Sequence, residues 1–231
     1  MKTSIASAIK DFRPGLAPTL VVLVLLPLMV GLGFWQLARG HEKQLLVDSY
    51  AERRVAEPLS SVQLDGMADP AFRRVRLRGQ FDAEHSVLLD NRMRDGKAGV
   101  ELLQPFHDQA SGEWLLLNRG WLPWPDRRTP PVFTTPEQPL NLDAWVYIAP
   151  GETFQLHADP ATTQWPRLLT ALHPAALWAE LGRSGFAYEL RAEPGPGTYD
   201  TTWPVVAMGP EKHLGYACLL YTSPSPRDVE E

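Results

Sequence analysis

An unbroken apolar segment near the N-terminus constrains this chain more than any other feature of its sequence. The 23 residues Leu16–Ala38 carry no charge and are flanked by Arg13 and Arg39. A helix needs about 20 apolar residues to cross the hydrocarbon core of a membrane. The apolar core of a signal peptide has roughly 7–15 residues, and no small-residue cleavage site precedes the charges that follow this segment. We therefore predict a retained transmembrane helix over residues 16–38, with a cleaved signal peptide as the alternative.

The charges on the two sides of this helix indicate its orientation. Three basic residues precede the helix and two follow it closely. Because loops rich in lysine and arginine stay in the cytoplasm, this small excess favours a cytoplasmic tail over residues 1–15 and an exported domain over residues 39–212. The N-terminal tail is too short and too poor in arginine for a mitochondrial transit sequence. The predicted location is a bacterial cell inner membrane, with the main domain in the periplasm.

Composition excludes several classes of protein. The 231 residues carry a formal net charge of -5, which does not fit a nucleic-acid-binding surface. The single cysteine, Cys218, excludes a disulfide framework, a four-cysteine zinc site and a CxxC redox motif. Hydrophobic residues make up 44% of the chain, which is enough for a folded core. We expect a folded domain that interacts with the lipid bilayer and does not bind nucleic acid.

The exported part reads as a series of short strands separated by turns. In the segment from Phe72, Val75 and Leu77 alternate with three arginines, as in a strand with one buried face. We predict a mainly β, α+β domain with an antiparallel barrel- or sandwich-like sheet and one or two helices. The predicted helices cover residues 41–56 and 173–182. The predicted strands cover residues 72–81, 85–91, 99–106, 113–121, 143–149, 186–191 and 204–208, with hairpins between the first two and between the next two.

A search for catalytic and metal-binding patterns finds none. The sequence has no GxSxG, HExxH, Walker or GxGxxG motif. Its six histidines include no pair at the i, i+4 spacing that places two metal ligands on one helical face. A membrane-anchored exported enzyme is therefore the weakest of the functional interpretations, and we expect no enzymatic activity.

Four blocks of sequence resemble the Surfeit locus protein 1 family of membrane factors for cytochrome c oxidase assembly. The segment after the apolar helix fills the pattern G-x-W-Q-x-x-R-x-x-x-K with Gly33, Trp35, Gln36, Arg39 and Lys43. The segment FRRVRLRGQFD, followed by VLLDNR, resembles the family's first hairpin region, and LLLNRGWLP resembles its NRGW block. EKHLGYA resembles the opening of its second membrane helix. The resemblance covers about residues 20–217.

The C-terminal sequence departs from the family pattern. Residues 213–217 resemble the start of a second transmembrane helix, but residues 218–231, CLLYTSPSPRDVEE, are polar and broken by proline. Residues 218–228 can be encoded by a string that resembles a transposon-based sequencing adapter read in frame. We therefore expect residues 218–231 to be a sequencing artefact and the natural protein to have two spans. Independent reads that confirm this tail and a stop codon at the locus would contradict that expectation.

The resemblance also implies a cofactor and partners. It implies binding or delivery of haem a to the first subunit of cytochrome c oxidase, with haem a synthase as a further partner. It singles out His213, whose imidazole could serve as the cofactor-binding axial metal ligand to the haem iron. The alternatives are an interfacial histidine that binds no iron, and a membrane-tethered scaffold that stabilises assembly intermediates without haem.

Two further groups of residues have open interpretations. The arginines of two predicted strands could pair with haem propionates or could form a solvated strand face. Trp121 and Trp124 could be membrane anchors or core aromatics. The arginines concerned are Arg74, Arg76, Arg78, Arg92 and Arg94.

Overall fold

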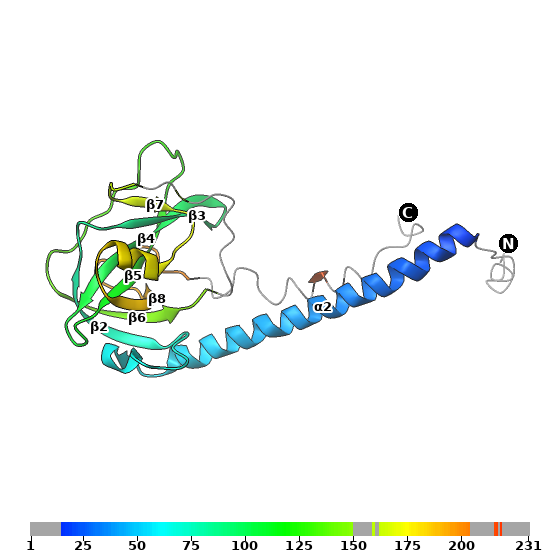
Figure 1. Cartoon of the computed structure of the whole chain (residues 1–231), viewed down its shortest axis with the longest axis horizontal. Coiled ribbons are helices and arrows are strands. Elements are labelled where there is room, and N and C mark those ends of the chain that lie inside the picture. Colours follow the sequence, from blue (N-terminus) through cyan, green and yellow to red (C-terminus); the bar gives the residue numbers. More distant parts are fainter. Residues whose placement is uncertain (1–14, 150–158, 160–161, 204–214, 217, 219–231) are drawn as a thin grey trace. The chain divides into compact units, whose positions relative to one another are not determined.

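The computed structural model describes residues 15–149, 159, 162–203, 215–216 and 218 (Figure 1). The chain divides into two compact units, one formed by Met1–Asp48 with Val205–Glu231 and the other by Ser49–Pro204. The first unit contains most of a long helix, and the second contains a β barrel. The strand predicted over residues 204–208 and residue His213 lie outside the described residues.

The N-terminal helix α2 covers Leu16–Val55, 40 residues, with Pro27 inside it. Its apolar side chains are exposed, and among the described residues it is the one helix long and apolar enough to cross a membrane. The sequence-based prediction of a separate helix over residues 41–56 is wrong, because that segment continues the apolar helix. No proline occurs between Pro27 and Pro58, so nothing in the sequence forces a break there.

The last turns of α2 belong to the barrel unit and pack on its wall. The ring of Tyr50 contacts Phe72 and Trp145, with ring centroids 5.6 and 5.2 Å apart. The guanidinium of Arg53 binds the carboxylate of Asp69 and the carbonyl of Ala71. These contacts hold the last turns of α2 against the barrel wall.

Five strands close into a barrel. Their order around the barrel is β2, β6, β8, β5 and β4, and pairing of β2 with β4 completes the circle. Each strand is bounded by a turn or loop, as the turn residues of the sequence predict. The strands are β2 (Arg74–Phe81), β4 (Lys97–Asp108), β5 (Trp114–Pro123), β6 (Leu140–Tyr147) and β8 (Gly185–Ala192).

Three shorter or outer strands and two helical segments complete the domain. β1 (Leu59–Ser60) pairs with β2, whereas β3 (Val87–Arg94) joins β4 to β7 (Arg167–Leu169). The 3-10 helix η1 covers Ser61–Leu64, and α3 covers Pro174–Glu180. The predicted helix over residues 173–182 is thus confirmed.

Two predictions about the sheet are wrong in part. β2 and β3 do not form the predicted hairpin, because β2 takes β6 and β4 as partners and β3 pairs with β4 and β7. The sheet is mixed, not antiparallel throughout, because β5–β8, β1–β2 and β3–β7 are parallel pairs. Parallel neighbours need long connections, and the segment between β5 and β8 contains β6, β7 and α3. The hairpin of β4 and β5 is confirmed.

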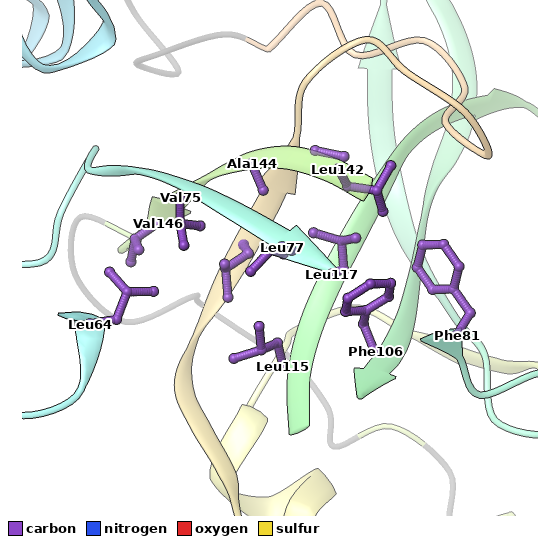
Figure 2. Packing of buried hydrophobic residues seen from close by; sticks show 12 residues of the cluster. Leu64, Val75, Leu77, Phe81, Phe106, Leu115, Leu117, Leu142, Ala144 and Val146 are labelled. Atoms are coloured by element: carbon purple, nitrogen blue, oxygen red, sulfur yellow. The ribbon is translucent and has the colours of Figure 1, made fainter. Parts of the chain in front are cut away.

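The main core fills the barrel interior (Figure 2). Val75 and Leu77 are fully buried, whereas Arg76 between them points outward, as the alternation in the sequence predicts. Trp121 and Trp124 are each only 8% exposed, so they are core aromatics of the domain. The core residues shown in Figure 2 are Leu64, Val75, Leu77, Phe81, Phe106, Leu115, Leu117, Leu142, Ala144 and Val146, to which Leu190 and Ala192 add.

Closure of the barrel depends on a close approach of two backbones. Gly79 of β2 lies opposite Asp108 of β4, and Phe81 lies opposite Phe106 with ring centroids 5.0 Å apart. A Cβ atom on Gly79 would lie 1.9 Å from the carbonyl oxygen of His107. Glycine is the residue that permits such an approach.

Candidate functional site

Three neighbouring strands place three charged side chains and one amide in the barrel wall. Glu101 on β4, Asn118 on β5, and Glu189 and Arg191 on β8 are all buried, and we call these four residues the polar cluster. The Asn118 amide donates hydrogen bonds to the carboxylates of Glu101 (2.9 Å) and Glu189 (2.8 Å). Arg191 Nε donates a third, to Glu189, at 3.0 Å. One amide and one guanidinium thus hold two buried carboxylates together.

Aromatic rings cover the guanidinium of Arg191. Its central carbon lies 3.5 Å from the ring centroid of Tyr147, 4.8 Å from that of Trp203 and 5.6 Å from that of Trp145. Stacking on rings is a favourable environment for a weakly hydrated guanidinium. The rings therefore keep Arg191 in place against the carboxylates.

The polar cluster has unusual electrostatics. Burial raises the pKa of Glu189, and the nearby charge of Glu101 raises it further, whereas Arg191 opposes the rise. Burial alone lowers the pKa of Arg191, but the carboxylates of Glu189 and Glu101 outweigh it and raise that pKa. Burial and the neighbouring carboxylate thus act on the pKa of Glu189 in the direction opposite to the charge of Arg191.

Replacing Glu189 by glutamine is expected to remove part of the pH dependence of stability. A group whose pKa is raised by folding contributes stability that is complete below its unfolded pKa, about 4.3, and is lost as the pH rises through the folded value. The melting temperature of Glu189→Gln should therefore fall less than that of the wild type as the pH is raised from 4 to 8. A difference of about 1 kcal/mol corresponds to a shift of about 2–4 °C.

The exposed carboxylate of Glu57 offers the matched control for this experiment. Glu57→Gln removes a surface charge from the same domain and should follow the wild-type pH profile. Parallel profiles for the wild type and Glu189→Gln in thermal unfolding would contradict the raised pKa.

A pocket of about 170 Å³ opens beside the polar cluster. Arg92 of β3 and Tyr147, Tyr188 and Glu189 form its polar side. A bulge between Leu89 and Arg92 interrupts the pairing of β3 with β4 at this point. The remaining lining is apolar and comprises Leu89, Ile148, Ala149, Leu172, Pro174 and Ala187.

Two other residues of the NRGW segment in β5, Arg119 and Gly120, stabilise the loops next to the barrel. Arg119 is 1% exposed, and it binds the carbonyls of Gly197 (2.7 Å) and Thr134 (2.8 Å). Gly120 has φ of 121°, and a Cβ there would lie 2.9 Å from the Asp200 carbonyl oxygen, so glycine is required. The segment thus fastens two loops to the barrel.

Three of the five arginines named as candidate haem propionate partners bind carboxylates of the protein itself. Arg74 forms two hydrogen bonds of 2.7 Å with Glu193, and Arg76 binds Asp143 at 3.2 Å. Arg94 forms an ion pair of 2.7 Å with Asp200. Arg78 is exposed on the outer face of β2. Of the five, Arg92 alone lines the pocket.

The histidines in the described part of the chain occupy separate places. His85 lies 2.7 Å from the carboxylate of Asp82, His107 packs beside Trp114, and His41 is exposed on α2. Among the described residues, no group of three or more His, Cys, Asp or Glu side chains could hold a metal ion. His213 lies outside the described residues, so the structure does not test its role.

The pocket on the barrel does not fit a haem. Sites for small molecules and cofactors usually have about 300–1,000 Å³, and a tetrapyrrole macrocycle needs a large apolar cleft. At about 170 Å³, this pocket is too small, and the described histidines do not line it.

The sequence does not predict the polar cluster as a unit, although it marks two of its members as unusual. Glu101 and Glu189 each interrupt an apolar strand-like run, GVELLQPF and FAYELR, at a position where a buried side chain is expected. A charged residue in such a position usually has a buried partner. The partners come from different strands, so their identity does not follow from the sequence.

The fold and the polar cluster define a class of protein: a closed five-strand barrel that follows a long apolar helix and contains buried charges in its wall. The sequence matches the SURF1 family over residues 23–219, which include most of the helix and the whole barrel. The chain therefore belongs to the SURF1 family, as the sequence blocks predicted.

Three curated relatives illustrate the similarity. The chain is 31% identical over 104 residues to the "SURF1-like protein" of Rickettsia felis, with 44% of this chain and 45% of the relative covered. It is 28% identical over 118 residues to "Surfeit locus protein 1" of Takifugu rubripes, with 44% and 49% covered. It is 31% identical over 94 residues to "Cytochrome oxidase assembly protein SHY1" of Saccharomyces cerevisiae, with 39% and 24% covered. The aligned regions thus span half or less of these relatives.

Proposed function

We propose that this protein is a membrane-anchored assembly factor for cytochrome c oxidase. The observation that carries the proposal is the family match over residues 23–219, together with a similar yeast protein whose name states a role in cytochrome oxidase assembly. The architecture supports it, because a 40-residue helix with exposed apolar side chains can tether a rigid barrel to a membrane. The partner is the oxidase, with its first subunit as the proposed contact.

For the cofactor, we propose that the protein binds or delivers haem a through His213. The imidazole of His213 would be the axial ligand, and bound haem a supplies the redox centre that the oxidase requires. Haem a synthase is the proposed source of the cofactor.

The His213 proposal predicts a specific loss. In the protein expressed from its own locus together with the haem a synthetic enzymes, His213→Ala should remove most of the bound haem a. The protein should remain folded and inserted, because one interfacial side chain contributes little to membrane insertion. The measurement is the ratio of haem a to purified protein. His85→Ala and His157→Ala serve as controls that should keep the wild-type ratio.

A scaffold that stabilises oxidase assembly intermediates without haem is the second candidate function. It requires only the family match and the exposed apolar helix, and it needs no cofactor site. If the wild type carries no haem a but still co-purifies with the oxidase first subunit, the scaffold is the correct interpretation. If His213→Ala keeps the wild-type haem ratio, the ligand assignment is wrong.

We propose that α2 crosses a bacterial inner membrane with residues 1–15 in the cytoplasm and the barrel in the periplasm. The length and exposed apolar surface of α2 support the crossing, and the charges that flank it support the direction. Alkaline phosphatase fused after Glu152 should therefore be active, because this enzyme requires the periplasm to form its disulfides. An inactive fusion, with a fluorescent cytoplasmic reporter active at the same point, would reverse the orientation.

A further inference from the structure

The pocket beside the polar cluster is lined by both apolar and polar side chains. Leu89, Ile148, Leu172 and Pro174 are apolar, and Arg92 is the cationic residue of the lining. The volume of about 170 Å³ is below the usual range of ligand pockets, so only a molecule of one ring or a short chain would fit. A molecule that fills this space must combine an apolar body with a polar group.

The guanidinium of Arg92 supplies the unused binding capacity. Its Nε atom is buried and has no hydrogen-bond partner among the described residues. Its ion pair with Glu101 is 3.6 Å long, which is too long for a hydrogen bond. The Arg92 side chain is 35% exposed, so the outer nitrogens of its guanidinium can be reached from solvent. Nε faces Glu101, so an entering ligand would bind the outer nitrogens of the guanidinium, whose charge Glu101 neutralises only from a distance.

The acceptors nearby are already in use, which determines the sign of the ligand. Glu189 accepts hydrogen bonds from Asn118 and Arg191, and Glu101 accepts one from Asn118. The group that remains available to a ligand is therefore the guanidinium of Arg92, a hydrogen-bond donor with a positive charge. A carboxylate matches the planar fork of an arginine with two parallel hydrogen bonds, which a single amide or hydroxyl oxygen cannot do.

We infer that this pocket binds a small monocarboxylic acid, with its carboxylate on Arg92 and its apolar body against Leu89, Ile148, Leu172 and Pro174. The hydrogen bonds that Glu189 accepts from Asn118 and Arg191 support this inference, because they offset the negative charge that would repel an entering carboxylate. The inference rests on the pocket of the folded domain and does not depend on haem or on the oxidase.

Calorimetric titration of the purified full chain in detergent micelles tests the site, with benzoate as the probe and benzamide as its neutral counterpart. Benzoate should bind at least tenfold more tightly than benzamide, because only benzoate offers two charged oxygens to Arg92. Arg92→Gln should weaken benzoate at least tenfold, whereas Arg92→Lys should retain part of the affinity. Arg76→Gln is the matched control, since Arg76 is exposed on β2 away from the pocket lining, and it should bind benzoate like the wild type.

A second variant keeps the test independent of any effect of Arg92 on folding. Ala187 lines the pocket and is exposed, so Ala187→Phe should fill the space and abolish benzoate binding while Arg92 stays intact. The inference is wrong if the wild type does not bind benzoate, if benzamide binds equally well, or if folded Arg92→Gln and Ala187→Phe bind benzoate as the wild type does.

Discussion

Replacing Gly79 by valine should prevent closure of the barrel. The first side-chain carbon would lie 1.9 Å from the carbonyl oxygen and 2.9 Å from the carbonyl carbon of His107, distances that Cβ atoms essentially never adopt. Relief requires β2 to separate from β4, which removes three backbone pairs and separates the rings of Phe81 and Phe106. The expected loss of stability is about 4 kcal/mol or more, because overpacking and loss of core contacts act together.

The neighbouring residue supplies a matched control for this substitution. Arg78→Val introduces the same branched side chain one residue earlier, on the exposed face of β2. It should change stability by less than about 1 kcal/mol. Urea unfolding and the near-ultraviolet circular dichroism of the purified chain would measure both variants. A Gly79→Val protein with wild-type stability and spectrum would show that the barrel does not close through this contact.

The strand pattern of the barrel could be predicted from the sequence because it is local. Val75 and Leu77 alternate with arginines, and this period of two determines which face of β2 is buried. The β4–β5 hairpin follows likewise from a turn sequence between two apolar runs. Such features depend on a few neighbouring residues and need no knowledge of the remaining chain.

The partners of β2 could not be predicted because they are distant in the sequence. A short turn follows β2, so the local pattern favoured a hairpin with β3, but β2 pairs with β6 and β4. Pairing over long separations is decided by packing in the whole barrel and not by the turn. The parallel pair of β5 and β8 has the same origin.

In the candidate site too, the local features could be predicted from the sequence and the long-range contacts could not. The segment NRGW was recognised as a block, but the function of Asn118 depends on two carboxylates that are 17 and 71 residues away from it in the chain. Arg92 lines the pocket because a bulge in β3 changes the register after Leu89. Neither the bulge nor the pocket leaves a pattern that can be read from one sequence.

Loss of the gene for this protein should strongly lower the amount of assembled cytochrome c oxidase in the membrane. The reason is the proposed role in assembly, which rests on the family match over residues 23–219 and on the similar yeast assembly protein. The oxidase genes remain intact in such a strain, so any deficit arises after synthesis of the subunits. A plasmid copy of the wild-type gene should restore the oxidase, whereas a Gly79→Val copy should not, because its barrel is not closed.

The most direct measurement is the haem a content of washed membranes, read from the reduced-minus-oxidised spectrum, in the wild-type, deletion and complemented strains. The proposal predicts a low haem a signal in the deletion strain, full recovery with the wild-type gene and with Arg78→Val, and no recovery with Gly79→Val. A deletion strain that keeps the wild-type haem a signal and oxidase activity would contradict a role in oxidase assembly.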